Sequence, residues 1–331
     1  MPELPEVETV VRDLARLAGG ATITEAQVLR ARNLATPDAD TFSTAMRNRR
    51  ILGARRRAKW IIVELSGGLL MLVHLRMTGQ LLLVPSGSEI DPYIRVTFTL
   101  ADGRDLRFRD VRAFGRVALV AERPDREPSS SLDPNGAPLF DDHGLEPLDS
   151  TFTSTDVARL FGARRARIKG LLLDQRYIVG IGNIYADEAL WRAGIHPATD
   201  ASRLAPHQFE ALHQAIVGVL GDAVEARGSS INDYTAPDGD GSMQERLDVY
   251  QRTGEPCRRC GTAIERIVLG GRGTHLCPRC QSAPARIRQA AATKRRRGPR
   301  WSSGVTPETL GATREERAAA GRRARRTGAP A

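Results

Sequence analysis

The chain has 331 residues, of which 41% are hydrophobic and 27% are charged, with 49 lysines and arginines against 39 acidic residues. This length predicts about two domains, and the hydrophobic fraction excludes a fully disordered chain. No apolar run reaches the ~18 residues of a membrane span, and the N-terminus lacks the basic and apolar segments of a signal peptide, so we expect a cytoplasmic protein.

The excess positive charge lies at the C-terminal end. Residues 282–331 contain 13 lysines and arginines against 3 acidic residues, a net charge of +10 that equals the formal charge of the whole chain. Residues 1–281 therefore contain as many basic as acidic side chains. The last segment also has few large apolar side chains, so we expect a disordered basic tail whose partner is an anionic polymer.

Residues 1–123 predict a β-sandwich with a helix at its N-terminus. The helix begins near Pro5, whose missing N–H is tolerated at a first helical position, and one face of this helix is apolar. Strand-like segments follow at residues 23–29, 51–57, 60–65, 69–75, 93–100, 106–109 and 115–120. The Asp102-Gly103 pair predicts a hairpin turn between two of them. Short strands separated by turn signals indicate an all-β sandwich or barrel that packs on the helix.

Residues 124–150 predict a linker, and helices begin beyond it. Residues 124–138 are rich in Pro, Ser, Asp and Gly. Apolar residues then recur at helical spacing in residues 155–161, 166–174, 183–193 and 206–226. We expect a helical domain of residues 151–250, in which the polar residues 234–245 form a mobile loop.

All four cysteines belong to one pattern in residues 251–281. Cys257 and Cys260 form one C-x-x-C pair, Cys277 and Cys280 form another, and 16 residues separate the pairs. This spacing is typical of a zinc ribbon, in which two tight turns present four thiolates to one metal. Four protein ligands leave no open position, so we expect one structural Zn²⁺. Two disulfides and a four-thiolate iron site are the alternatives.

The N-terminus offers a candidate nucleophile. Removal of the initiator methionine would leave Pro2 with a secondary α-amine, and α-amines have a pKa of about 8, so part of it is neutral at physiological pH. Attack of this amine on the anomeric carbon of a sugar gives an iminium that makes the neighbouring hydrogen acidic. Glu3 and Glu6 lie close enough in sequence to act as acid and base. The ordinary alternative is that a Met-Pro start and early helical glutamates have no catalytic meaning.

Five short segments and the cysteine module carry a resemblance to a known family. The segments read PELPEVETV at 2–10, RAKW at 57–60, HLRMTG at 74–79, DVRAFG at 110–115 and VGIGNIYA at 179–186. In this order they resemble the formamidopyrimidine-DNA glycosylases, and the resemblance covers residues 1–281. It implies an α+β fold of two domains, an N-terminal β-sandwich and a C-terminal helix–two-turns–helix domain with the zinc ribbon, and it places DNA in the cleft between them.

The resemblance assigns the chemistry to the N-terminus. It implies that Pro2 attacks the sugar and forms a Schiff base, that Glu3 is the acid and base beside it, and that Glu6 is a supporting carboxylate. Lys59 would transfer protons and contact a phosphate of the damaged nucleotide, which suits the compact charge and shiftable pKa of lysine. Arg272, near the tip of the predicted ribbon hairpin, would grip the backbone around the lesion and counts among the catalytic residues.

The resemblance also implies the contacts to DNA. Met77 and Phe114 would fill the gap left by the extruded base, and Arg112 would hydrogen-bond the widowed base. Without the family, these would be a core methionine, a core phenylalanine and a surface arginine. The other implied DNA-binding residues are His74, Lys169, Asn183 and Arg272. Glycines around Asn183 allow close backbone approach, and its amide can donate to phosphate.

The implied reaction is excision of an oxidised base from duplex DNA, followed by strand cleavage through β- and δ-elimination. The enzyme would then be both a DNA glycosylase and an abasic-site lyase of base-excision repair. The target base must first be flipped out of the duplex. We expect no organic cofactor and no catalytic metal, and a monomer whose partner is damaged double-stranded DNA.

The sequence favours oxidised purines, 8-oxoguanine and formamidopyrimidines, as the substrates. Leu4 stands where the endonuclease VIII branch of the superfamily usually has glycine, and residues 234–245, with Tyr234 and Met243, resemble a loop that caps the purine. Met243 stands where we would expect an aromatic residue. The alternatives are an endonuclease VIII-like enzyme for oxidised pyrimidines, a non-catalytic DNA-binding relative and an RNA-associated protein.

Overall fold

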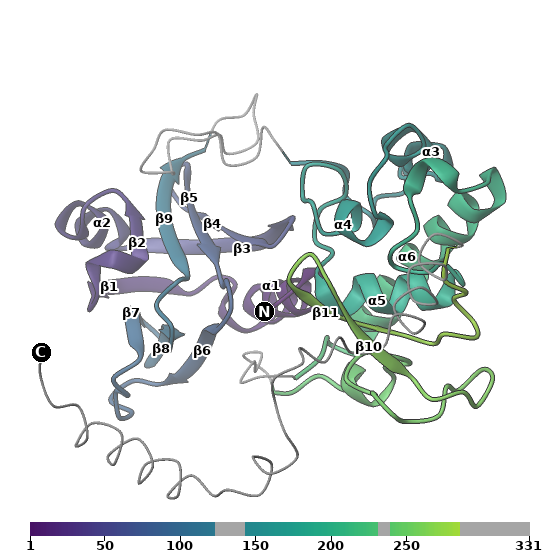
Figure 1. Cartoon of the computed structure of the whole chain (residues 1–331). Coiled ribbons are helices and arrows are strands. Elements are labelled where there is room, and N and C mark those ends of the chain that lie inside the picture. Colours follow the sequence, from purple (N-terminus) through teal and green to yellow (C-terminus); the bar gives the residue numbers. More distant parts are fainter. Residues whose placement is uncertain (123–142, 231–238, 285–331) are drawn as a thin grey trace, which may run out of the picture. The chain divides into compact units, whose positions relative to one another are not determined.

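Nine strands form the sheet of the N-terminal region in the computed structural model, which describes residues 1–122, 143–230 and 239–284 (Figure 1). The strands are β1 (Thr22–Val28), β2 (Leu34–Thr36), β3 (Arg49–Arg57), β4 (Trp60–Leu65), β5 (Leu69–His74), β6 (Gly79–Pro85), β7 (Ile94–Leu100), β8 (Arg104–Asp110) and β9 (Arg116–Ala121). Their order is β2-β9-β5-β4-β3-β1-β7-β8-β6, and only β2 and β9 pair in parallel. β1 and β3 pair at only two positions, so this short contact joins two halves of the sheet.

The two halves of the sheet share one apolar core. Ile61 of β4 and Phe98 of β7, which belong to different halves, are both fully buried in the same cluster. Helix α1 (Leu4–Ala18) adds Val7, and α2 (Ala39–Met46) adds Phe42. Alternate residues of the strands, such as Ile61, Val63 and Leu65 of β4, and the apolar face of α1 build this core. The predicted β-sandwich with an N-terminal helix is confirmed.

Three elements of this region were not predicted from the sequence. Helix α2 has only eight residues, and it begins at Asp38, whose carboxylate accepts hydrogen bonds from the backbone N–H groups of Asp40 and Thr41. Strand β2 has three residues, and β6, in which only residues 81–84 form an apolar run, pairs with β8 along its whole length. Short elements give little periodicity, and tertiary contacts decide their state.

The second region is helical, with four helices among its described residues. They are α3 (Ser154–Phe161), α4 (Ile168–Leu172), α5 (Asn183–Arg192) and α6 (Pro206–Glu225). The short 3₁₀ helices η2 (Ala201–Arg203) and η3 (Met243–Glu245) also belong to this region, whereas η1 (Ala31–Asn33) lies between β1 and β2. Each predicted helix is present. α4 is shorter than residues 166–174 because Ala166 and Arg167 are extended and pair with residues 200 and 201.

The ribbon forms a two-stranded hairpin of β10 (Glu265–Leu269) and β11 (Arg272–Leu276) (Figure 1). Gly270 and Gly271 form its tip with φ angles of 56° and 76°. These left-handed angles are readily adopted only by glycine, so the glycine pair sets the position of the turn. Arg272 is therefore the first strand residue after the tip, as the sequence predicts.

The regions are connected through contacts of α1 and of residues 143–150. Helix α1 contacts β3 and β4 on one side and α6 on the other. Leu145 forms a parallel bridge with Ile178, so the end of the predicted linker packs on the helical region. Most of that linker, Tyr234 and the basic tail from residue 285 lie outside the described residues. Within the described residues, no helix is long and apolar enough to cross a membrane.

Candidate active site

A cavity of about 290 Å³ lies at the N-terminus of the chain. Its lining residues are Met1, Pro2, Glu3, Glu6, Met77, Asn183, Ile184, Ser229, Tyr250 and Arg272. They come from the start of the chain, the loop before β6, α5, the segment after α6 and the ribbon. The structure thus brings together the predicted Pro2, Glu3 and Glu6 with the predicted Asn183 and Arg272, which lie more than 170 residues away in the sequence.

Glu3 fixes the N-terminus of the chain against α5. It is the N-cap residue of α1, but its carboxylate accepts hydrogen bonds from the backbone N–H groups of Gly182 (2.7 Å), Ile184 (2.9 Å) and Tyr185 (3.3 Å). The N-cap of α5 is Gly182, which has no side chain, so Glu3 satisfies the unpaired N–H groups of that helix instead. A Cβ at Gly182 would lie 2.3 Å from Glu3 Cδ, so this position requires glycine.

The carboxyl group of Glu3 is poised for proton transfer. Glu3 is 2% exposed, and this burial raises its pKa from 4.5 to about 7. Lys59 lowers the pKa, Glu6 raises it, and the N–H groups of Ile184 and Tyr185 lower it. Burial is the largest of these effects. A carboxyl group that is half ionised near neutral pH can both donate and accept a proton.

Glu6 ties α1 to the segment after α6. Its carboxylate accepts hydrogen bonds from the Glu3 N–H (2.8 Å), the Tyr185 hydroxyl (2.5 Å) and the Ser229 N–H (2.8 Å). Burial raises the pKa of Tyr185 well above 10, with further contributions from Glu6 and Glu3, so Tyr185 remains a hydrogen-bond donor. Glu6 therefore holds the backbone that carries Pro2 and Glu3 in place.

Lys59 lies behind the cavity. It is 7% exposed, and its Nζ donates to the carbonyl of Ile181 (2.9 Å), one residue before the N-cap of α5. Burial lowers the pKa of Lys59, whereas Glu3 and Glu6 raise it and Arg272 lowers it. Lys59 and Glu3 therefore shift the pKa of each other, although Lys59 does not line the cavity.

The turn that carries Lys59 is held from the helical region. Ala58 has a φ of 53°, and its N–H donates to Glu146 Oε1 (2.6 Å). Arg57 donates to the same oxygen (2.9 Å), and Arg56 donates to Glu146 Oε2 (2.7 Å). Burial raises the pKa of Glu146, but Arg56 and these hydrogen bonds outweigh it, so the pKa is lowered. Glu146 is therefore ionised, and its hydrogen bonds hold the turn that carries Lys59.

Three exposed side chains form a cluster beside the cavity. Met77 is 40% exposed and Phe114 is 42% exposed, which is unusual for large apolar side chains. The Arg112 guanidinium stacks on the Phe114 ring at 5.0 Å, and its Nη1 lies 3.2 Å from Met77 Sδ. The Arg112 N–H also donates to Thr78 Oγ1. The predicted trio is therefore together and faces solvent, not the core.

His74 is held as a neutral donor. Its Nδ1 accepts the Arg76 N–H at 3.0 Å, which puts the ring proton on Nε2. Burial, with smaller contributions from Arg76 and Lys59, lowers the pKa of His74 well below 6.5. The ring also packs edge-on against Trp60 at 4.8 Å. His74 can therefore offer one fixed N–H to a phosphate oxygen.

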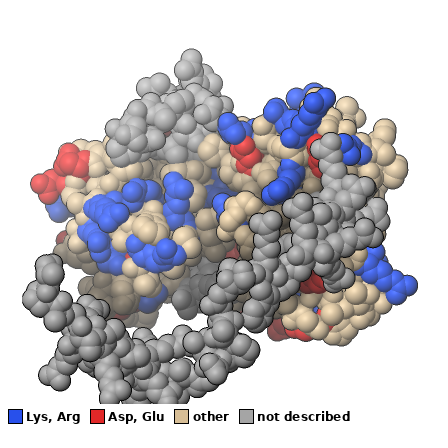
Figure 2. Space-filling model, in the orientation of Figure 1, with Lys and Arg blue, Asp and Glu red and all other residues tan. Residues whose placement is uncertain are grey.

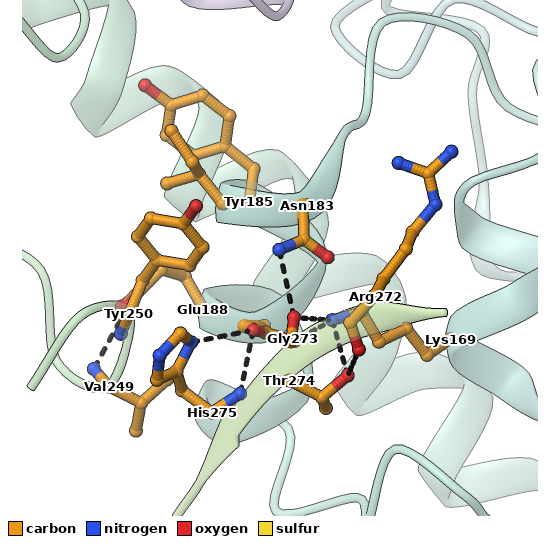
Figure 3. Close-up of polar contacts among 12 residues, drawn as sticks. Lys169, Asn183, Tyr185, Glu188, Val249, Tyr250, Arg272, Gly273, Thr274 and His275 are labelled. Atoms are coloured by element: carbon orange, nitrogen blue, oxygen red, sulfur yellow. Dashed lines mark hydrogen bonds and ion pairs between the residues drawn. The ribbon is translucent and has the colours of Figure 1, made fainter. Parts of the chain in front are cut away.

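Lys169 has contacts that differ from the predicted role. It is 2% exposed, and its Nζ donates to Asp187 Oδ1 at 2.6 Å. Figure 3 shows its other two hydrogen bonds, to Thr274 Oγ1 (2.9 Å) and to the carbonyl of Gly273 (3.2 Å). These three acceptors use all three hydrogens of the ammonium group. These contacts hold the ammonium group inside the protein, and a direct contact of Lys169 with a DNA phosphate stays a prediction. Asn183 donates from Nδ2 to the same Gly273 carbonyl at 3.0 Å.

The lesion-loop assignment also changes. Met243 is 1% exposed and belongs to the core of the helical region, at the start of η3. It packs there as an ordinary core methionine, and it does not line the cavity. Tyr234 lies among residues 231–238, outside the described part of the chain.

The four cysteines form a closed metal site. Their sulfur atoms all lie within 4.8 Å of one another, with Cys257 and Cys280 at 3.9 Å and Cys260 and Cys277 at 3.5 Å. Tetrahedral zinc with Zn–S bonds of ~2.3 Å places sulfurs about 3.8 Å apart, so the four thiols fit the ion. These separations exclude disulfides. The donor set holds one structural Zn²⁺ and stabilises the hairpin that carries Arg272.

Basic side chains prevail on one visible face of the molecule. In Figure 2, lysine and arginine side chains gather over the sheet region, and a second group gathers over the helical region near α3, whereas acidic side chains are fewer. In the helical region, Arg164, Arg165 and Arg167 are exposed. Such surfaces attract a polyanion through its backbone charge.

Comparisons with known proteins decide the family. Family models match residues 1–117 as the formamidopyrimidine-DNA glycosylase N-terminal domain, 143–235 as its H2TH domain and 254–283 as a zinc finger found in FPG and IleRS. The formamidopyrimidine-DNA glycosylase of Chloroflexus aurantiacus is 46% identical over 282 residues, which cover 85% of this chain and 98% of that protein. The chain belongs to the formamidopyrimidine-DNA glycosylase family. It is a DNA glycosylase of base-excision repair.

Solved structures of this family have the same fold. A point mutant of the Lactococcus lactis FPG, in complex with a Fapy-dG containing DNA, superposes with a TM-score of 0.76 at 33% identity, covering 85% of this chain and 100% of that one. The Lactococcus lactis protein with abasic-site DNA gives the same values. The glycosylase fold, with a sheet domain, an H2TH domain and a four-cysteine zinc finger, is therefore confirmed for this chain.

Several functional contacts of this glycosylase were not found from the sequence. Tyr185, Ser229 and Tyr250 line or support the cavity, and Glu146 holds the Lys59 turn. The partner of Glu146 lies 88 residues earlier in the chain, so no local pattern indicates the contact.

Proposed function

We propose that this glycosylase removes oxidised purines, 8-oxoguanine and formamidopyrimidines, from duplex DNA through the secondary amine of Pro2. The observation that carries the proposal is the cavity in which Pro2 stands beside a buried Glu3 whose pKa is raised to about 7. The Lactococcus lactis protein bound to Fapy-dG containing DNA supports the substrate class. Met1 lines the same cavity, so the reaction requires its removal.

The amine of Pro2 would attack C1′ of the deoxyribose, and the bond from C1′ to the base would break. The departing base takes the bonding pair and a proton, and opening of the sugar ring leaves an iminium between Pro2 and C1′. Protonated Glu3 can donate to the ring oxygen as the ring opens, and the ionised carboxylate can accept a proton later. Loss of a 2′ hydrogen then expels the 3′ phosphate, and a second elimination expels the 5′ phosphate.

Duplex DNA would bind with the target base turned out of the stack. Met77 and Phe114 are exposed apolar side chains that can fill the space left by the base, and Arg112 is held between them to meet the opposite base. His74, Asn183 and Arg272 would contact phosphates. The enzyme would act as a monomer, and in the cytoplasm, because its substrate is the chromosome.

Borohydride trapping tests the proposal. The enzyme is incubated with duplexes that contain 8-oxoguanine or thymine glycol, and the iminium is reduced to a stable adduct. We expect a covalent adduct with the 8-oxoguanine duplex whose peptide link maps to Pro2. An adduct at another amine, or full activity of enzyme that retains Met1, would contradict the proposal. Mass spectrometry of the N-terminus gives the second result.

Oxidised pyrimidines are the second candidate substrate. One structure of the Lactococcus lactis protein contains an oxidized pyrimidine in its DNA. A higher trapping yield with thymine glycol than with 8-oxoguanine would favour this reading. The chemistry at Pro2 would be unchanged, so the comparison of yields separates the substrate question from the mechanism.

A further inference from the structure

A buried polar cluster lies directly behind Arg272 and joins α4, α5 and the ribbon (Figure 3). Asp187 of α5 is fully buried, and it accepts hydrogen bonds from Lys169 Nζ (2.6 Å) and from the His275 N–H (2.9 Å). Lys169 also donates to Thr274 Oγ1, and Thr274 is itself 0% exposed. The cluster thus binds three consecutive ribbon residues, Gly273 to His275.

The carbonyl of Gly273 is the central acceptor of this cluster. It accepts from Lys169 Nζ at 3.2 Å and from Asn183 Nδ2 at 3.0 Å. The Gly273 carbonyl belongs to the peptide one residue beyond Arg272, and Thr274 Oγ1 donates to the carbonyl of Arg272 itself at 3.2 Å, so the cluster fixes the backbone on the C-terminal side of Arg272. Figure 3 shows the Arg272 guanidinium extending away from the cluster. Arg272 lines the Pro2 cavity and also a second cavity of about 320 Å³ beside α4.

The tip of the hairpin has little else to hold it. Gly270 and Gly271 have left-handed backbones and no side chains, and among the described residues their backbone groups form no hydrogen bond outside the hairpin. β11 is a strand of a two-stranded hairpin, which is only marginally stable alone. Besides the zinc site at the other end of the hairpin, the buried ion pair, its hydrogen bonds and the Asn183 amide are the contacts that tie the residues next to Arg272 to the helical region.

We propose that Lys169 is a positioning residue that acts through the Gly273 carbonyl to hold Arg272 toward the DNA backbone at the Pro2 cavity. The proposal rests on the proposed function of Arg272 as a phosphate contact. It assigns Lys169 a role different from direct phosphate binding, because all three of its ammonium hydrogens have protein acceptors. Asp187 takes part in this positioning, because its carboxylate pairs with the buried Lys169 ammonium group.

A double-mutant cycle tests the proposal. The variants Arg272→Ala, Lys169→Met and the double variant are compared for binding to a duplex with a tetrahydrofuran abasic-site analogue, from low to high salt, and for single-turnover excision of 8-oxoguanine. We expect each single variant to weaken binding roughly tenfold and the double variant to be no weaker than Arg272→Ala. Arg272→Ala should lower the salt slope by about 0.9, the value of one phosphate contact. Adding Lys169→Met should leave that slope unchanged.

A matched control separates positioning from general destabilisation. Arg107 is also a buried cation, with hydrogen bonds to the Asp105 carboxylate and to the carbonyls of Ser88 and Glu89, but it lies in β8 of the sheet. Arg107→Met should lower the melting temperature. Any effect it has on the free energy of DNA binding should add to that of Arg272→Ala. The effect of Lys169→Met on the free energy of DNA binding should instead disappear when Arg272→Ala is already present.

A second variant keeps the test decisive if Lys169→Met does not fold. Asp187→Asn keeps the shape of the side chain and removes the charge that holds Lys169. It should therefore weaken DNA binding in the wild type but not in the Arg272→Ala variant. Melting temperature and bound zinc are measured for each variant to confirm the native ribbon.

Three results would overturn the inference. A further drop of about 0.9 in the salt slope when Lys169→Met is added to Arg272→Ala would identify a direct phosphate contact. Wild-type affinity and rate in folded Lys169→Met would show that the hairpin needs no anchor. If Arg272→Ala alone leaves binding unchanged, the phosphate role of Arg272 fails and the inference with it. Borohydride trapping at Pro2 then shows whether the proposed reaction stands.

Discussion

The cavity at the N-terminus and the cluster of Met77, Arg112 and Phe114 depart from the ordinary distribution of side chains in opposite directions. The cavity buries charge: Glu3 and Glu6 are each 2% exposed. The cluster exposes large apolar side chains. Burial of a carboxyl group costs stability, and it raises the pKa of Glu3 to about 7, which suits the proton transfer that we propose for Glu3. Exposure of apolar surface costs little stability but suits insertion between bases. The two regions meet at Met77, which lines the cavity, and the proposed function assigns chemistry to the first and base extrusion to the second.

Replacement of Glu3 by glutamine should have the largest effect. The amide cannot transfer protons at neutral pH, so single-turnover excision of 8-oxoguanine should fall by roughly 10²–10⁴-fold. The wild-type rate should show an inflection near pH 7, the pKa of Glu3, and the variant should lack it. Rapid-quench kinetics from pH 5 to 9 measure both. An inflection that persists in the variant would assign the titration to another group.

The same variant should change how stability depends on pH. The pKa of Glu3 is raised from 4.5 to about 7 in the folded state, so the folded chain binds its proton more tightly than the unfolded chain between these values. The stability that Glu3 contributes is therefore fully present below pH 4.5 and is lost as the pH rises toward 7, by up to about 3 kcal/mol. Urea unfolding at pH 5 and pH 8 should show a smaller loss for Glu3→Gln than for the wild type.

Removal of the apolar wedge should leave the chemistry intact. Met77→Ala with Phe114→Ala should slow excision from duplex DNA by roughly 10–100-fold, because unstacking a base costs a few kcal/mol that the wedge offsets. Cleavage at an existing abasic site should fall much less. The unfolding free energy should change little, since both side chains are about 40% exposed. Leu52→Ala is a control, because Leu52 is an exposed apolar residue on β3 (60%). An equal fall in rate on both substrates would show that Met77 and Phe114 act in the chemical step and not in base extrusion.

Loosening of the Lys59 turn should have a moderate effect. Glu146→Gln keeps one oxygen for the Ala58 N–H but loses the charge that pairs with Arg56 and Arg57. A small displacement of a catalytic group lowers rates, so we expect about a tenfold slower excision. Hydrogen exchange at the Ala58 amide should rise in parallel. Glu64→Gln breaks the Arg55 pair between the same two strands and serves as a control that should keep the wild-type rate.

The sequence predicts the cavity and the metal site better than the contacts that hold them. Pro2 and Glu3 are adjacent, and the cysteine pairs have a diagnostic spacing, so both were found from local pattern. Glu146 and Lys169 act on residues 88 and 104 positions away, where no local rule applies. Met243 was placed in a polar loop, but its apolar side chain turns into the helical core. Local composition could not foresee that, because burial depends on the fold around it.

Deletion of residues 285–331 should have the smallest effect on catalysis, and this segment differs from both regions in composition, because it is rich in basic residues and poor in large apolar ones. The segment carries the whole formal excess of positive charge. Its removal should weaken binding to undamaged DNA and flatten the salt dependence of that binding, because fewer counterions are released. Truncation after Pro284 spares Gln281, which accepts from the Cys277 N–H and donates to the Ile195 carbonyl. Single-turnover excision should stay near the wild-type value. An unchanged salt slope would mean that the basic side chains of the folded body account for the electrostatic part of DNA binding by themselves.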